Sequence, residues 1–328
     1  MNLLFYTHEF NLKEGRPCTK RIDSLASYLT DKKNNVTILT SSYNKANDNI
    51  CDNRNYKIIY SYGTKNTKKN KIARLFTDFS FTITSIFKAI IAIKKIDAII
   101  ITSPPIIPSI SGYIIGKLKK ARIIFDVRDI WPDVALEMGS FSKKSIYYKV
   151  FNSIAKFMYK HSDYVTTVTP GKVKKLEKCT NPTKIKFISN GLDDNFTSFP
   201  IDRNIIERYR LEQKFTVIYT GNVGLAQNLD ALLEIAEDYK NNDKMQFIIF
   251  GDGAYKSCLQ KKIEEKNLTN FILEDRVDYS KINTILTYSK ISFISLKNNK
   301  MIDSVPTKIF EALGIGCPVL LLANRRCL

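Results

Sequence analysis

The stretch SVPTKIFEALGIGCPVL, residues 304–320, contains the signals of a short helix that leads into a buried strand. Pro306 suits the first turn of a helix, because its missing N–H leaves no donor unpaired there. Gly314 or Gly316 can adopt the left-handed conformation that ends a helix. The apolar run at residues 319–323 then predicts a buried strand.

Two charged residues make this helix a candidate binding element. Lys308 lies in the first turn, where free backbone N–H groups and the helix dipole favour an anion. Glu311 follows three residues later on the same side and can accept hydrogen bonds from a diol such as a ribose. An ion pair between the two residues on a solvated face is an equally open interpretation.

Strands alternate with helices along the chain, which predicts parallel sheets with right-handed connections. We therefore expect an α/β protein with two Rossmann-like domains that face each other across a cleft, residues 1–198 and 199–328. The first series of predicted strands covers residues 3–7, 36–40, 56–60, 98–102, 121–126, 164–168 and 184–189. The second series covers residues 216–220, 246–250, 271–273 and 292–296.

Composition narrows the class of protein. The six cysteines are scattered without a C-x-x-C pair, which indicates reduced thiols in the cytoplasm and no zinc site. Two histidines are too few for a histidine-rich metal centre. The first ten residues have no basic leader and predict a strand instead of a secretory signal. Residues 98–116 are uncharged, but their prolines favour a strand, a loop and a helix over a membrane span.

The net charge of +19 is concentrated in the first part of the chain. Residues 1–200 carry a net +17 and residues 201–328 a net +2. Such asymmetry indicates an anionic partner for the first part, namely membrane lipid, nucleic acid or a phosphorylated substrate. The dense basic segment 65–74 precedes a largely apolar helix, 75–93, a combination that suits docking on an anionic membrane. A solvated lysine-rich surface over an ordinary buried helix is the alternative.

Loops beyond the carboxyl ends of parallel strands are where ligands bind in such sheets. The loop after the first strand contains Gly15 and Arg16. Gly221 and Gly224 follow the first strand of the second domain, where backbone N–H groups can approach a diphosphate closely. This spacing is not the G-x-G-x-x-G fingerprint, so alone it is a weak signal.

The segment DVRDIWPD, residues 126–133, is more specific because it combines three carboxylates, Arg128 and the only tryptophan. A carboxylate there can orient or deprotonate a hydroxyl, while Arg128 can hold a phosphate. A structural role is equally open, with an Asp–Arg pair fixing the loop and Trp131 filling the edge between domains.

Taken together, these segments resemble the bacterial family 4 glycosyltransferases of the GT-B fold, especially the branch that assembles O-antigen, capsule or colanic-acid-type polysaccharides. The resemblance covers essentially the whole chain, with the motifs in the family's order. Besides the first loop around Gly15, the motifs are FDVRDIWPDVALEMG (125–139), SNGLDDNF (189–196), YTGNVGLAQNLDALL (219–233), FGDG (250–253) and VPTKIFEALGIGCPV (305–319).

The resemblance implies transfer, with retention, of a hexosyl or N-acetylhexosaminyl group from a nucleotide sugar to an acceptor hydroxyl, without a bound metal or other cofactor. The second domain would bind the donor. Glu311 matches the later glutamate of the family's E-x7-E motif and would contact the ribose, while Asp303 stands at the earlier one. The other implied donor-binding residues are Thr307, Lys308, Gly221, Asn222 and Gly224. Lys308 is the clearest phosphate-binding cation, because the basic pair often found in the loop at 221–228 is absent.

The first domain would bind the acceptor, with Gly15 and Arg16 on that side. Asp129 is the predicted catalytic base, next to Arg128, where many relatives have a histidine. The expected acceptor is a lipid-diphosphate-linked saccharide at the cytoplasmic face of the membrane, where the basic domain would meet anionic lipid. Nucleic acid is not an expected partner, since no binding motif or interleaving of aromatic and basic residues is present.

The end of the chain departs from the family. Only residues 323–328 remain after the last predicted strand, whereas members usually continue for several dozen residues. The resemblance therefore implies an incomplete second domain, truncated before its last βα units and the helix that returns to the first domain. An inactive remnant and a nucleotide-sugar 2-epimerase on the same fold are the alternative functions.

Overall fold

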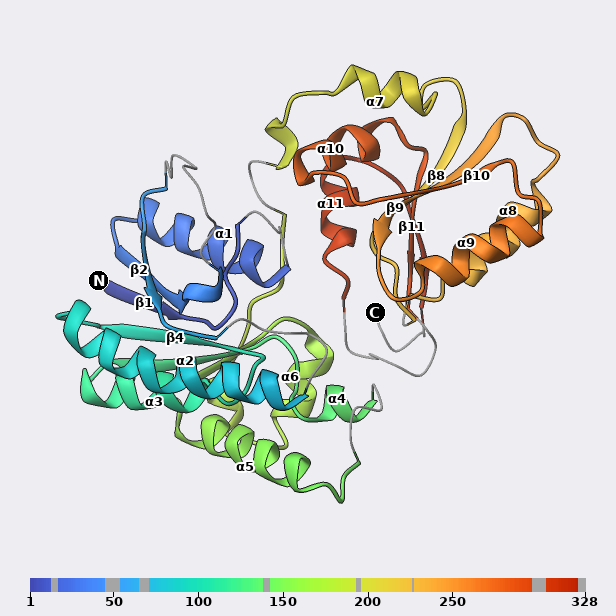
Figure 1. Cartoon of the computed structure of the whole chain (residues 1–328). Coiled ribbons are helices and arrows are strands. Elements are labelled where there is room, and N and C mark those ends of the chain that lie inside the picture. Colours follow the sequence, from blue (N-terminus) through green and yellow to red (C-terminus); the bar gives the residue numbers. More distant parts are fainter. Residues whose placement is uncertain are drawn as a thin grey trace. The chain divides into compact units, whose positions relative to one another are not determined.

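A computed structural model describes residues 1–12, 17–44, 54–64, 71–137, 142–192, 196–225, 227–296 and 305–323. The chain forms two compact units, residues 1–189 and 190–328 (Figure 1). The units divide between residues 189 and 190, earlier in the chain than the boundary expected at 198/199. Phe196 accounts for the difference, since its side chain is fully buried in a core cluster of the second unit.

The first unit is built on a parallel sheet with strand order β3-β2-β1-β4-β5-β6-β7. The strands are β1 (Asn2–Tyr6), β2 (Asn35–Ser41), β3 (Lys57–Ser61), β4 (Ala98–Ser103), β5 (Arg122–Val127), β6 (Tyr164–Thr167) and β7 (Ile185–Phe187). The helices are α1 (Pro17–Asp31), α2 (Lys71–Ala92), α3 (Ser109–Leu118), α4 (Asp133–Glu137), α5 (Ile146–His161) and α6 (Pro170–Leu176).

Both faces of this sheet are covered, which is why its strands are near-continuous apolar runs. Helix α1 covers one face through Ile22 and Ala26, which pack with Phe5 and Ile38 of the strands. Helices α2, α3 and α5 cover the other face, where Phe81, Ile115 and Phe151 join the strand residues in one cluster (Figure 1).

The second unit contains a parallel sheet with strand order β10-β9-β8-β11-β12. Its strands are β8 (Phe215–Asn222), β9 (Met245–Asp252), β10 (Phe271–Glu274), β11 (Ile291–Ser295) and β12 (Val319–Leu322). Its helices are α7 (Arg203–Arg208), α8 (Asp230–Asp238), α9 (Lys256–Glu265), α10 (Tyr279–Tyr288) and α11 (Lys308–Gly314). Helices α8 and α9 contribute to one core cluster, and α7, α10 and α11 contribute to another.

Two local predictions, those for residues 98–116 and for the end of the helix at 308–314, are confirmed. The uncharged segment 98–116 forms β4, a loop and the start of α3. Helix α11 ends at Gly314, and of the two candidate glycines it is Gly316 that has the left-handed conformation, with φ 78°. The four cysteines within the described ranges are free thiols. None of the helices described is both long enough and apolar enough to cross a membrane.

Candidate functional site

Two loops of the second unit meet at the carboxyl ends of β8 and β9. Gly221 and Gly251 are paired in register across these strands. A Cβ atom on Gly251 would lie 2.0 Å from the carbonyl oxygen of Gly221, and one on Gly253 would lie 2.3 Å from that of Val223. Because no side chain fits at these positions, the two loops can touch only through glycine.

Lys308, the first residue of α11, lies across this glycine loop. A Cβ on Gly221, whose φ is +123°, would be 2.6 Å from Cε and 2.7 Å from Nζ of Lys308. The Lys308 ammonium stands 3.9 Å from the centre of the Tyr219 ring, within the range of a cation–π contact. The Tyr219 hydroxyl donates a 2.6 Å hydrogen bond to the carbonyl oxygen of Asn222. Tyr219 therefore contacts both the cation and the loop.

The electrostatics of this site favour an incoming anion. The pKa of Lys308 is lowered to about 7, mainly because burial disfavours the charged ammonium. The nearby Glu311 carboxylate acts to raise this pKa, and the Arg276 guanidinium acts to lower it. Glu311 is itself buried, at 9% exposure. A diphosphate beside Lys308 would stabilise the charged ammonium.

Arg276 is a residue of this site that sequence reasoning missed. It lies in the loop between β10 and α10, and its Nη2 is 3.4 Å from the carbonyl oxygen of Asp252 at the end of β9. Its positive charge acts to lower the pKa values of both Lys308 and the Tyr219 hydroxyl. The signal that could have identified it is position, because it follows a strand at the carboxyl edge of the sheet.

The structure brings together part of the predicted donor site. Gly221 and Lys308 are in contact, and Asn222 is linked to them through Tyr219. The carbonyl oxygen of Gly224 accepts a bond from the N–H of Gln227 at 3.2 Å. Thr307 directly precedes α11, and Asp303 lies outside the described residues. The donor-binding roles of these residues stay predictions.

In the first unit, Asp126 of the DVRDIWPD segment is held by a buried ion pair. Arg21 of α1 donates from Nε and Nη2 to the two carboxylate oxygens at 3.2 and 3.0 Å, and Thr166 adds a 2.6 Å bond. Arg21 also donates to the carbonyl oxygen of Ser189 at 2.9 Å. An Asp–Arg pair thus does fix this region, but its arginine comes from α1 and not from the loop itself.

We expect Arg21→Met to destabilise the protein by about 3–5 kcal/mol, because it would leave the Asp126 carboxylate buried without its cation. Urea unfolding measures the change. The matched control is Arg54→Met, which breaks the more exposed pair with Asp23 and should cost about 1 kcal/mol or less. Equal losses in both variants would show that the Arg21 pair has no special structural role.

Asp129 and Arg128 have different surroundings. Asp129 is about one-third exposed and lies 3.4 Å from the buried Nζ of Lys172, at the start of α6. Arg128 donates from Nη2 to the carbonyl oxygen of Pro104 at 2.6 Å, which joins the loops after β4 and β5. Trp131 stacks edge-on against Phe151 of α5, within the first unit. Gly15 and Arg16 lie outside the described residues.

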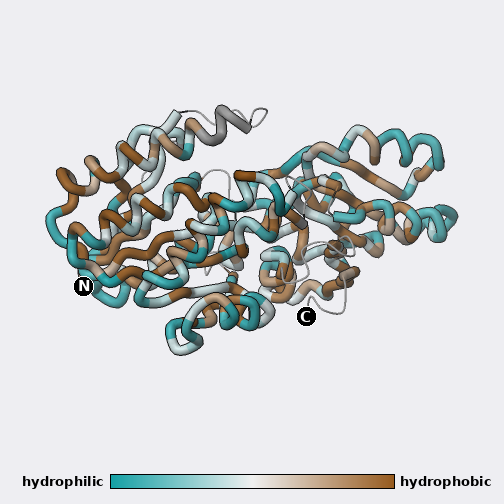
Figure 2. Tube along the Cα trace, turned by 90° about the horizontal axis from the view of Figure 1, so that it is seen from below, coloured by the Kyte–Doolittle hydropathy of each residue, from teal (hydrophilic) through white to brown (hydrophobic). Residues whose placement is uncertain are grey.

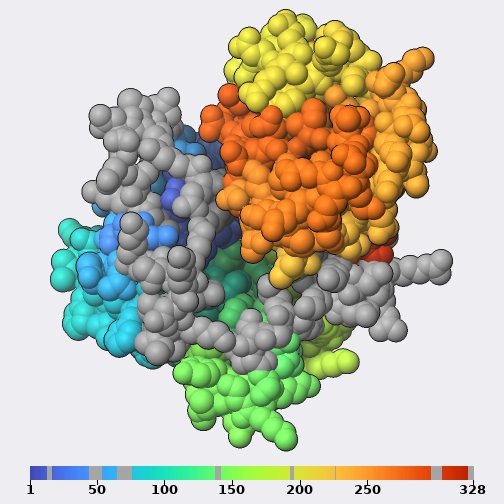
Figure 3. All heavy atoms as spheres, turned by 45° about the vertical axis from the view of Figure 1, so that its right-hand side comes forward, coloured from blue at the N-terminus to red at the C-terminus, as the bar shows by residue number. Residues whose placement is uncertain are grey.

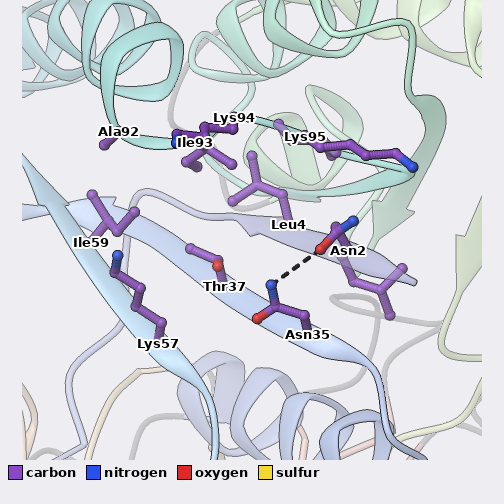
Figure 4. Close-up of a pocket in the computed structure, with 12 residues that line it drawn as sticks. Asn2, Leu4, Asn35, Thr37, Lys57, Ile59, Ala92, Ile93, Lys94 and Lys95 are labelled. Carbon is purple, nitrogen blue, oxygen red and sulfur yellow. Dashed lines mark hydrogen bonds between the residues drawn. The ribbon is translucent and has the colours of Figure 1, made fainter.

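A pocket of about 230 Å³ lies at the opposite end of the first sheet. Figure 4 shows Asn2, Thr37 and Lys57 around it, near the amino ends of the strands, with Lys94 and Lys95 above them. The Nδ2 of Asn35 donates to Oδ1 of Asn2 at 3.1 Å. Because parallel sheets bind ligands at their carboxyl ends, this pocket is a poor candidate for the active site. The described residues contain no cluster of three or more acidic, His or Cys side chains able to hold a metal.

Two family models match the chain. Residues 19–196 match the model described as Glycosyltransferase Family 4, and residues 202–326 match that of Glycosyl transferases group 1. The chain is 24% identical over 203 residues to a Pseudomonas aeruginosa protein named as a probable glycosyltransferase, WbjE, covering 61% of this chain and 50% of that protein. It is 22% identical over 253 residues to WcaI of Escherichia coli strain K12, named for colanic acid biosynthesis, covering 75% of this chain and 62% of that protein. The chain thus spans between half and two-thirds of these relatives.

Among solved structures, the chain is similar to Anabaena HepE in complex with UDP-glucose. The TM-score is 0.69 at 13% sequence identity, over 98% of this chain and 80% of HepE. At this identity the likeness establishes the fold alone. The expected GT-B fold, with two Rossmann-like sheets, is therefore confirmed.

Proposed function

Because the chain belongs to glycosyltransferase family 4, we propose that it transfers a sugar from a nucleotide-sugar donor to an acceptor hydroxyl. The observation that carries this proposal is the placement of Lys308 across Gly221, with Arg276 close by, at the carboxyl edge of the second sheet. Two cations beside a glycine loop suit the diphosphate of a nucleotide sugar, and Glu311 suits its ribose.

The proposed chemistry follows from charge. Breaking the bond between the sugar and the nucleotide leaves negative charge on the departing diphosphate. The Arg276 guanidinium, and the Lys308 ammonium once the diphosphate keeps it protonated, would stabilise this charge as it develops. Asp129 remains the proposed group that orients or deprotonates the acceptor hydroxyl, and the Nζ of Lys172 lies 3.4 Å from its carboxylate.

We further propose that transfer proceeds with retention and moves a hexosyl or N-acetylhexosaminyl group. The proposed pathway is assembly of a cell-surface polysaccharide such as O-antigen or capsule, with a lipid-linked saccharide as acceptor and the protein peripheral on the inner face of the membrane. Its support is the similarity to WcaI, which is named for colanic acid biosynthesis, and the basic first part of this chain.

Incubation with a panel of nucleotide sugars and lipid-linked acceptors tests the proposal. We expect one donor to be consumed with formation of a glycosylated acceptor whose anomeric configuration, measured by NMR, matches that of the donor. A C2-epimer of the donor formed without acceptor would instead identify an epimerase. Absence of both turnover and nucleotide-induced thermal stabilisation would indicate an inactive remnant.

Donor binding should depend on pH through Lys308. In the free protein its ammonium is charged below about pH 7 and loses its proton above it. Because an anion binds the charged form, affinity for UDP-glucose should fall as the pH rises above 7, by at most about tenfold per unit. Calorimetric titration from about pH 6 to pH 9 measures this, and in Lys308→Met the slope should disappear. An unchanged slope in that variant would assign the titration to another group.

A further inference from the structure

Unlike an ordinary surface helix, α2 turns polar side chains toward the protein interior and large apolar side chains toward solvent. Its buried side carries Thr77, Asp78 and Ser85 beside Phe81 and Ala89. Its outer side carries large apolar residues that are between 45% and 82% exposed. We call these residues the outer row: Phe76, Phe79, Ile83, Phe87, Ile90 and Ile91.

The buried polar side chains of α2 have partners inside the first unit. The Ser85 hydroxyl forms a 2.8 Å hydrogen bond with that of Tyr6, and Asp78 lies 3.8 Å from Nε2 of His8. These partners fix the rotation of the helix about its axis. The outer row therefore faces away from the sheet as a consequence of packing, and turning it inward would strip these polar groups of their bonds.

The outer row is continuous along the helix. From Phe76 to Ile90 its members recur every three or four residues, the spacing of one helical face, and Ile91 directly follows Ile90. Figure 2 shows brown, apolar positions recurring along α2, and in Figure 3 the cyan atoms of this region stand at the surface of the first unit. A contiguous exposed apolar surface of this kind marks an interaction site.

A groove between α2 and α5 extends this surface. It encloses about 340 Å³ and is lined by Phe79, Ile110, Ile146, Val150 and Ile154, among other apolar residues. At the start of α5, Ile146 and Tyr147 are both at least half exposed. The outer row and the first turn of α5 thus form one apolar surface with a recess suited to a hydrocarbon chain.

The border of this surface is positively charged. Helices α2, α3 and α5 contain a single carboxylate, Asp78, which is buried. Exposed lysines stand on all three helices: Lys88, Lys117, Lys149, Lys156 and Lys160. An apolar surface bordered by cations matches the acyl chains and phosphate groups of an anionic lipid layer.

We propose that the outer row of α2 and the first turn of α5 insert into the headgroup region of an anionic bilayer, with the bordering lysines on lipid phosphates. This inference deepens the proposed membrane location and names the surface that achieves it. Helix α2 would lie in the membrane plane. A second copy of the chain is a poorer occupant, because it would bring two lysine borders into contact.

Vesicle cosedimentation tests the proposal with the full chain. Vesicles of phosphatidylcholine with about a third phosphatidylglycerol should bind it, and pure phosphatidylcholine vesicles should bind it far less. We expect Phe79→Ser/Ile83→Ser/Phe87→Ser to weaken binding at least about tenfold. We expect Lys149→Gln/Lys156→Gln/Lys160→Gln to weaken it about 100-fold at about 0.1 M salt and less at about 1 M salt.

The matched control is Tyr28→Ser/Tyr239→Ser, which removes exposed aromatic rings outside α2 and α5 and should leave vesicle binding unchanged. Urea midpoints of all variants verify folding. Unaltered binding by the apolar triple variant would overturn the proposal. A second result would also overturn it. The wild-type protein would form a dimer in sedimentation equilibrium, and the apolar triple variant would be monomeric yet still bind vesicles. Titration with the panel of nucleotide sugars needs no vesicles, so failure of docking and failure of the proposed donor binding are distinguishable.

Discussion

Replacing Lys308 with methionine is expected to lower kcat/KM for the donor by roughly 10²- to 10³-fold. Methionine keeps an unbranched side chain beside Tyr219 and Gly221 but removes the ammonium that would meet the diphosphate. Most of the loss should appear in kcat, since charge on the leaving group is greatest in the transition state. Steady-state kinetics with the donor found by the panel measures both constants.

The control for this variant is Lys244→Met. Lys244 is an exposed lysine of the same unit, but it precedes β9 at the amino edge of the sheet, opposite the candidate site. The Lys244→Met substitution removes the same charge and should leave kcat and KM within about twofold of wild type. If both variants lose activity equally, net charge and not the position of Lys308 would explain the effect.

Replacing Gly221 with alanine should reduce donor affinity by about 10- to 100-fold, although it removes no functional group. The new methyl group would lie 2.6 Å from Cε and 2.7 Å from Nζ of Lys308, so the lysine must leave its position. The backbone at φ +123° adds strain of about 1–3 kcal/mol for any residue with a Cβ. Calorimetric titration with the donor found by the panel measures the affinity, and urea unfolding measures the strain.

Gly316→Ala separates these two effects. Gly316 also has a positive φ, 78°, but no atom beyond its own chain neighbours lies within 4 Å of where its Cβ would stand. It should therefore lose stability while retaining donor affinity. A comparable loss of affinity in Gly316→Ala would mean that general loosening, and not displacement of Lys308, weakens binding.

The strands and the longer helices were predictable because their signals are local. Continuous apolar runs bounded by turn residues identify buried parallel strands, as for β4 and β5. The short helix α7 was missed, although Asp202 accepts bonds from the N–H groups of Asn204 and Ile205 at its start. A six-residue helix has too few turns for a periodic pattern, so its capping residue was the one available signal.

Side-chain partners were less predictable because they are distant in the sequence. Arg21 and Asp126 are separated by 105 residues, so the sequence indicates the carboxylate but not the cation that pairs with it. Lys308 and Gly221 were both selected, but their direct contact depends on the order of strands in the sheet. The sequence shows that α2 is apolar, yet which side faces outward is decided by Tyr6 at the end of β1 and by His8 just after it.

The central claim is that the Lys308 cluster binds the diphosphate of a nucleotide sugar. Calorimetric titration of the protein with a panel of nucleotide sugars tests it most directly. We predict saturable binding of at least one nucleotide sugar at a single site per chain, weakened at least about tenfold in both Lys308→Met and Gly221→Ala. Absence of binding by every nucleotide sugar, or binding that neither substitution alters, would contradict the claim.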